Sequence, residues 1–144
     1  MDFLQDLGYD VLAGLLYGLV GIALMLAGFF VIDLLTPGRL GQLITVERRR
    51  DVGTVVASAM LAVGAIVTSA ILASDGDLSH GLAESAGFGL VGILLLGVAF
   101  AAIDRITPGS LGEILADEHE DPAVAWVTAA SLLGVGAIIA AAIS

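Results

Sequence analysis

The sequence predicts an all-α membrane protein with four transmembrane helices, built from two tandem parallel two-helix repeats. Three observations support this fold class. The mean hydropathy is +1.04 with only 14% charged residues, which is not the composition of a water-soluble domain. Four apolar runs are each about 20 residues long, enough to cross roughly 30 Å of hydrocarbon at 1.5 Å per residue. A polar motif also occurs twice. The four runs are 11–32, 52–73, 85–103 and 123–143.

The repeated motif is Asp-x-x-Thr-Pro-Gly-x-Leu-Gly, which starts at Asp33 and, 71 positions later, at Asp104. The same offset holds upstream of the motif, and one inserted residue restores the match downstream. The matching segments are 18–22 with 89–93, and 63–66 with 135–138. The chain therefore divides into a first transmembrane hairpin, residues 1–73, and a second, residues 74–144.

The first apolar run is expected to remain in the mature protein. It is too long for a signal peptide and lacks the basic flank and small-residue cleavage site of one. Before it, residues 1–10 carry Asp2, Asp6 and Asp10 among apolar residues, which predicts a short interfacial turn. The chain has no cysteine, which excludes a disulfide, a thiolate metal site and a cysteine nucleophile.

The charge distribution predicts the orientation in the cell membrane. The chain has fifteen acidic residues and five basic residues, and all five basic residues are arginine. This excess of negative charge excludes nucleic acid as an obvious partner. Every arginine lies in residues 34–51 or 105–122, the two connections inside the hairpins. Arginine-rich short loops stay in the cytoplasm, so both termini are expected outside it and both halves point the same way. The lack of lysine fits a high-salt cytoplasm and equally fits codon bias.

The same two connections are expected to begin with short interfacial helices. Thr36 and Thr107 have the character of helix N-caps, each followed by proline at the first helical position. Beyond these helices the loops diverge in charge, because an arginine cluster in the first is replaced by acids at 117–121. The remaining residues of this turn motif are Pro37, Gly38, Pro108 and Gly109, and the arginine cluster is Arg48, Arg49 and Arg50.

Glycine spacing predicts close helix packing. Glycines recur at helical intervals in the first and third apolar runs, where a missing side chain lets another backbone approach. The halves are therefore expected to pack through these two helices, and the protein is expected to form a homo-oligomer. The glycines predicted to mediate packing are Gly14, Gly18, Gly21 and Gly92.

Asp33 and Asp104 are the strongest candidates for chemistry, because a carboxylate at the end of an apolar run is costly and each has an equivalent in the other half. Parallel repeats would place them at one depth, facing each other in a cation or proton site with Thr36 and Thr107. The structural alternative is that each aspartate reaches interfacial water, pairs with an arginine or orders the turn. Glu84, His80 and His119 are expected to be solvated. No metal, cofactor or catalytic residue is predicted.

This doubled motif in a four-span chain resembles the YjfL-like membrane proteins, the family known as domain of unknown function three-fifty. The resemblance covers nearly the whole chain. Its specific part is Asp33, Thr36, Pro37 and Leu40 together with Asp104, Thr107, Pro108 and Leu111. The resemblance implies an integral inner-membrane location and a two-helix duplication, without an established activity or cofactor.

Two functions follow as hypotheses. In the first, the protein forms an oligomeric ion or proton pathway, or a small-solute transporter, that uses the paired aspartates. In the second, it is a membrane scaffold or lipid-binding module whose residues 48–50 contact anionic headgroups, each arginine contributing roughly 1 kcal/mol. An enzyme is not expected, since no serine, histidine and aspartate could meet on one membrane face.

Overall fold

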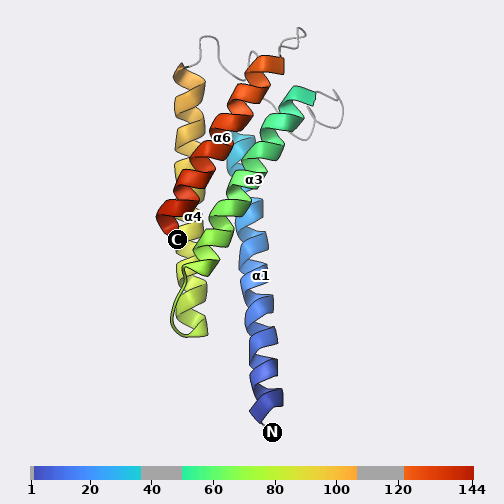
Figure 1. The fold of residues 1–144 in the computed structure, drawn as a ribbon, viewed down its shortest axis with the longest axis vertical. Coiled ribbons are helices and arrows are strands. Elements are labelled where there is room, and N and C mark those ends of the chain that lie inside the picture. The colour runs from blue at the N-terminus through green and yellow to red at the C-terminus, as the bar shows by residue number, and fades with distance from the viewer. Residues whose placement is uncertain (1, 37–49, 107–121) are drawn as a thin grey trace.

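The structure is a computed structural model that describes residues 2–36, 50–106 and 122–144. The described residues form four helices, all long and apolar enough to span a membrane. Neighbouring helices along the chain run in opposite directions, so α1 and α4 point one way and α3 and α6 the other (Figure 1). The predicted four-span all-α fold is confirmed. The helices are α1 (Asp2–Leu35), α3 (Arg50–Leu72), α4 (Leu78–Ile106) and α6 (Pro122–Ile143).

Two helices begin earlier than the hydropathy indicates. The interfacial turn predicted for residues 1–10 is wrong, because α1 is already helical from Asp2 and extends past the α3–α4 turn (Figure 1). This segment contains no proline, and the single Gly8 costs a helix interior only about 1 kcal/mol. Helix α4 starts at Leu78 instead of Ser85, because the carbonyl of Asp77 already accepts a hydrogen bond from the Gly81 amide at 2.9 Å.

The two halves meet most extensively between α3 and α6, and less between α1 and α4. This corrects the expectation that the first and third apolar helices form the main contact. The reason lies in the small residues of α3 and α6, since a methyl group placed on Gly136 would overlap the Cα and Cβ of Ala62. Small side chains let two backbones approach closely and gain van der Waals contact in lipid.

Within each half, the two helices pack through a matching glycine contact. A methyl group on Gly21 would lie 3.7 Å from both Val67 and Ile71. One on Gly92, 71 residues later, would lie within 3.4 Å of both Ile139 and Ile143. These two isoleucines follow Val67 and Ile71 by 72 residues, the offset that the single inserted residue requires. Each hairpin is therefore closed by β-branched side chains resting on an equivalent glycine.

Candidate functional site

The centre of the four-helix bundle is closed and apolar. The void between the helices measures about 10 Å³, at the lower limit of the space that one water molecule needs. Every residue that lines it is apolar; examples are Ile32, Val63, Ile93, Phe100 and Leu132. A path for ions or polar solutes through this part of the chain would require the helices to separate.

Buried polar side chains do not form a track across the bundle. The Ser58 hydroxyl donates a hydrogen bond to the Val55 carbonyl at 2.7 Å, and the Ser85 hydroxyl donates to the Gly81 carbonyl at 2.8 Å. Both bonds stay within the helix that carries the serine. Among the described residues, every buried side-chain nitrogen or oxygen has a hydrogen-bond partner. These two hydroxyls are satisfied within their own helices, and Thr128 is the third buried polar residue of the described chain.

The two candidate aspartates are half-buried near the ends of α1 and α4, but the helix register does not place them side by side. A methyl group on Gly89 would overlap Leu24, and one on Gly97 would lie 3.0 Å from Val31 and 3.3 Å from Leu35. These partners are 65, 66 and 62 positions apart, not the 71 that relates the repeats.

Across this contact, Asp33 lies level with residues 95–99 of α4. Asp104 is then five to nine residues further along α4, which is about 8–14 Å at 1.5 Å per residue. This register does not favour a facing pair of carboxylates within a single chain, and the pair stays a prediction. Contacts of α1 side chains with glycines of α4 set the register between these two helices. This register differs from the 71-residue offset of the repeats.

Thr36 stabilises the end of α1. Its hydroxyl donates a hydrogen bond to the Ile32 carbonyl at 2.9 Å, and its amide donates to the same carbonyl at 3.0 Å. The hydroxyl proton is therefore engaged by the helix that ends here, while the hydroxyl oxygen can still accept a hydrogen bond. The predicted capping of a following helix stays a prediction. The rest of the motif and its interfacial helices, with the arginine cluster and His119, lie outside the described residues. These positions are Pro37, Gly38, Arg48, Arg49, Thr107, Pro108 and Gly109.

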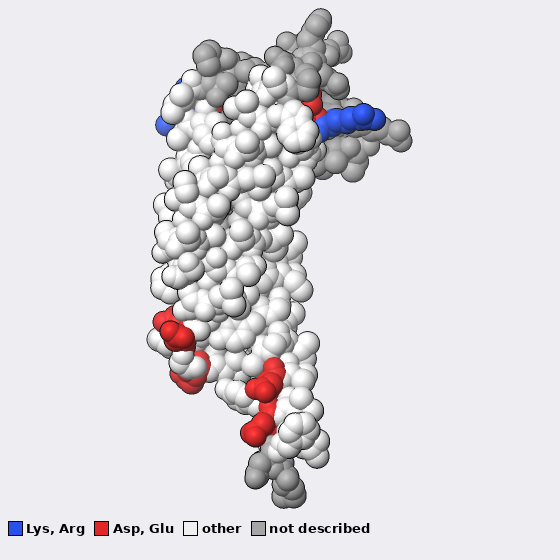
Figure 2. All heavy atoms as spheres, in the orientation of Figure 1, with Lys and Arg blue, Asp and Glu red and all other residues white. Residues whose placement is uncertain are grey.

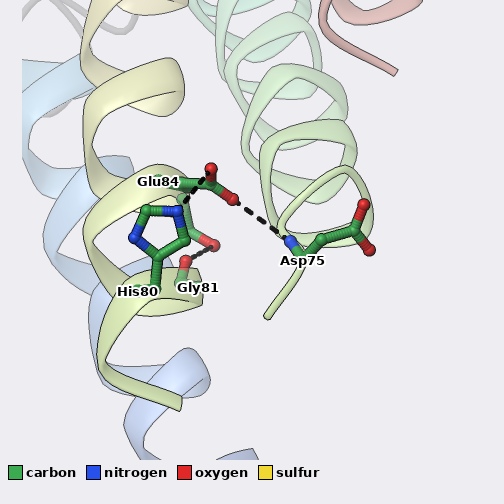
Figure 3. Close-up of polar contacts among 5 residues, drawn as sticks. Asp75, His80, Gly81 and Glu84 are labelled. Atoms are coloured by element: carbon green, nitrogen blue, oxygen red, sulfur yellow. Dashed lines mark hydrogen bonds and ion pairs between the residues drawn. The ribbon is translucent and has the colours of Figure 1, made fainter. Parts of the chain in front are cut away.

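The best-defined polar cluster lies in the α3–α4 turn, at the opposite end of the bundle (Figure 3). The Glu84 carboxylate accepts a hydrogen bond from the Asp75 amide at 3.1 Å, and its other oxygen lies 3.1 Å from His80 Nε2. The His80 side chain is exposed, as the sequence predicted, and it also pairs with the half-buried Glu84. Glu84 bridges the first turns of α4 to the end of α3, and this contact fixes the turn.

Asp77 stabilises the start of α4. The Ser79 hydroxyl donates a hydrogen bond to the Asp77 carboxylate at 2.6 Å, and this bond lowers the pKa of Asp77 below its ordinary value. A lowered folded-state pKa stabilises the fold above the ordinary pKa of the group, and this contribution is lost as the pH falls through the lowered value. Asp77 is fully exposed, so the effect is confined to the turn.

Charge separates towards the ends of the molecule. Arg50 begins α3 and Arg105 lies in the last turn of α4, next to Asp51 and Asp104. In Figure 2 the basic side chains lie at one end, a long uncharged middle follows, and only acids lie at the other end. Among the described residues, the acids of that second end are Asp6, Asp10, Asp75, Asp77 and Glu84. The uncharged middle is the band expected of a membrane-embedded surface.

Two of the predicted packing glycines do not pack within the chain. Side chains added at Gly14 or Gly18 would meet no atom within 4 Å, whereas Gly21 and Gly92 both contact another helix. Gly18 instead lies in an open groove of about 370 Å³ between α1 and α3. Gly89 also packs against another helix and was not among the predicted packing glycines, although the repeat relates it to Gly18. The side chain of Leu24 lies against Gly89, where close packing of two glycine-containing helix faces was expected.

Comparison with known proteins agrees with this membrane architecture. The chain is similar to a UPF0719 transmembrane protein from Mycolicibacterium paratuberculosis, with 39% identity over 132 residues, covering 92% of this chain and 87% of that protein. It is equally similar to UPF0719 transmembrane proteins from Mycobacterium bovis and Mycobacterium tuberculosis, with 39% identity over 136 residues, 94% of this chain and 89% of each relative. No solved structure matches. The model of the family described as Domain of Unknown Function (DUF350) matches residues 4–143, and the chain belongs to this family.

Proposed function

We propose that this protein is a non-enzymatic scaffold of the cell membrane, a helical unit that associates with its own copies and does not itself conduct ions. The observation that carries the proposal is the closed apolar centre, whose void of about 10 Å³ is lined by apolar residues alone. Moving an ion into such a centre without polar partners costs several kcal/mol or more. The described interior fits a packed structural element better than a pore.

The acidic and basic ends support an orientation with the arginine end in the cytoplasm. Arg50 and Arg105 are both exposed there, on the side where basic residues are retained. At that surface each arginine would contribute roughly 1 kcal/mol to the attraction of anionic headgroups. Contact with anionic lipid would hold the scaffold at a fixed depth.

An ion or proton pathway is the second candidate, and the half-buried positions of Asp33 and Asp104 favour it. Carboxylates at the ends of spanning helices are costly unless they are compensated. The register of the α1–α4 contact favours a pathway between copies, where carboxylates of different chains could approach one another.

Flux measurements in liposomes distinguish the two candidates. Purified protein is reconstituted over a tenfold range of protein-to-lipid ratio, and proton flux is followed with an internal pH dye against protein-free liposomes. A scaffold leaves the proton permeability unchanged at every ratio. The matched variant carries Asp33→Asn and Asp104→Asn, and its helicity is checked by circular dichroism. Proton flux that exceeds the protein-free control, and that is lost in the folded double variant, would contradict the scaffold and support the ion pathway.

A further inference from the structure

The second half of the chain carries a groove that the first half fills. We define the second-half groove by Gly89, Gly92, Gly97 and Gly136, all of which are buried. The side chains that fill it come from both helices of the first half. Leu24 rests on Gly89, Ile66 on Gly92 and Ala62 on Gly136, and both Val31 and Leu35 lie against Gly97. We call Leu24, Leu35, Ala62 and Ile66 the first-half ridge.

The equivalent groove in the first half is open. Its positions, offset by 71 residues in α1 and by 72 in α3, are Gly18, Gly21, Leu26 and Gly64, and all four line the 370 Å³ groove between these helices. A methyl group on Gly18 or Gly64 would meet no atom within 4 Å, and Leu26 is 66% exposed. Three of the four positions keep the residue type of the filled groove.

The equivalent ridge in the second half is also unused. Leu24 is 6% exposed, but its counterpart Leu95 is 51% exposed; Ile66 is 0% exposed, but its counterpart Ile138 is 70% exposed. The counterpart of Leu35 is Ile106, which is 81% exposed. The counterpart of Ala62 is Gly134, which also faces outward. We call Leu95, Ile106, Gly134 and Ile138 the second-half ridge.

We propose that the second-half ridge of one copy of this chain occupies the open first-half groove of another copy, in a head-to-tail contact that repeats the interface between the two halves. Leu95 then rests on Gly18, and Ile138 rests on Gly21. The occupant is a second copy because the exposed ridge carries the same leucine and isoleucine, at matching positions, that fill the second-half groove. The α4–α6 hairpin runs in the same sense as the α1–α3 hairpin, so both copies keep one orientation in the membrane.

The physical basis of the contact is van der Waals packing. Lipid tails solvate leucine as well as protein does, so helices associate where small residues let larger side chains approach closely. The open groove offers such positions at Gly18, Gly21 and Gly64. Because different surfaces meet, the contact is heterologous and leaves a free ridge on one copy and a free groove on the other. Additional copies could therefore join at either side. This inference rests on the proposed scaffold function, because it names the partner of the scaffold, a second copy of the chain.

Disulfide crosslinking tests the contact, because the chain has no cysteine of its own. The variant with Gly18→Cys and Leu95→Cys is oxidised in native membranes and separated on a non-reducing gel. We expect a ladder of dimers and larger species. The matched internal control carries Leu24→Cys and Gly89→Cys, and it should form a bond within one chain at unchanged mass. A surface control pairs Gly18→Cys with Leu90→Cys on another face of α4 and should remain monomeric.

Mixing single variants tests the head-to-tail arrangement. Chains with only Gly18→Cys and chains with only Leu95→Cys should each stay monomeric, whereas their co-expression should give dimers and nothing larger. Dimers from Gly18→Cys alone would mean that two identical grooves meet, and this would overturn the proposal. Absence of every intermolecular bond while the internal control crosslinks would also overturn it, since a lipid chain or another protein would then fill the groove.

A groove-filling variant gives a second test. Gly64→Leu points into open space in the single chain and should not disturb its folding. Added to the chain with Gly18→Cys and Leu95→Cys, it should reduce the crosslinked ladder at least tenfold. An undiminished ladder would show that the open groove is not the contact. Both crosslinking tests are independent of ion flux, so the proposed scaffold and the proposed interface can fail separately.

Discussion

Single glycines of α4 have different roles according to the face on which they lie. Gly92 is buried against Ile66, Ile139 and Ile143, which belong to α3 and α6. Gly87, five residues earlier on the same helix, is exposed, and an added methyl group would meet nothing within 4 Å. Both are glycines in one apolar helix, so composition alone cannot separate a packing position from a lipid-facing one.

We expect Gly92→Leu to destabilise the fold, because the added side chain would force three isoleucines apart. Overpacking of this kind costs typically about 1–3 kcal/mol, and more where backbones must move. Gly87→Leu is the control, with an expected change within about 0.5 kcal/mol. Thermal unfolding in detergent, followed by circular dichroism, measures both. Equal midpoints for the two variants would contradict the placement of Gly92 between the helices.

Residue-level expectations from the sequence had mixed success. The glycine contacts at Gly21 and Gly92 occur, but Gly14 and Gly18 lie open. A glycine pattern shows where a backbone can be approached and does not say what approaches it. Likewise, the repeat relates Asp33 to Asp104 in the sequence but does not fix their separation, because side-chain contacts between α1 and α4 set the helix register.

At the level of elements, the α3–α4 turn is the connection between helices that the structure describes in full. Gly76 has φ of +94°, a backbone conformation that side chains disfavour. The neighbouring Asp75 amide is bound by Glu84 at 3.1 Å, and Asp77 begins the next helix. A left-handed residue between two helix ends allows the chain to reverse within a few residues and keeps α3 beside α4.

Gly76→Ala is expected to destabilise the hairpin by about 1–2 kcal/mol, the cost of a Cβ in a left-handed conformation. The matched control is Gly53→Ala in α3, where the added methyl group meets nothing within 4 Å. There, alanine should be neutral or stabilise the helix by up to about 1 kcal/mol. Unfolding midpoints in detergent and cleavage of the turn by added protease should change in opposite senses for the two variants. A stabilising Gly76→Ala would show that the turn does not need its positive φ.

Element boundaries show why hydropathy predicted four helices and misplaced two of their starts. Lipid crossing fixes the apolar length, so the central parts of α1, α3, α4 and α6 follow from the sequence. Helix hydrogen bonds can continue beyond the lipid, however, and hydropathy carries no signal for that continuation. Residues 2–10 and 78–84 are polar or mixed in character yet helical, because nothing in either segment stops the helix.

At the scale of the whole molecule, two similar hairpins use their similar surfaces unequally. The second-half groove is filled and the first-half groove is open, although their glycines correspond. If a two-fold axis related the halves, the contact of Leu24 with Gly89 would be repeated inside the chain by Leu95 and Gly18. Leu95 and Gly18 are both exposed instead. The halves are therefore related head to tail, a relation that leaves one ridge and one groove for other molecules.

The molecule also has two chemically different ends, and these determine its expected orientation. Arg50 begins α3 and Arg105 lies in the last turn of α4, whereas the α3–α4 turn and the start of α1 bring acids to the opposite end. Figure 2 shows basic side chains at one end only. Retention of basic residues in the cytoplasm would place the first end inside the cell and the turn outside it. The end of α6 points the same way as the turn, so Ser144 belongs to the outer side (Figure 1).

Cysteine labelling in intact cells tests this orientation without background, since the chain contains no native thiol. Asp75→Cys and Ser144→Cys, both at exposed positions, should react with a membrane-impermeant maleimide added outside. Arg50→Cys, exposed at the opposite end, should react only after the cells are permeabilised. If Arg50→Cys is labelled in intact cells and the other two variants are protected, the protein has the opposite orientation in the membrane. The arginines would then face outward, and the attraction to cytoplasmic anionic lipid on which the scaffold's depth depends would be lost.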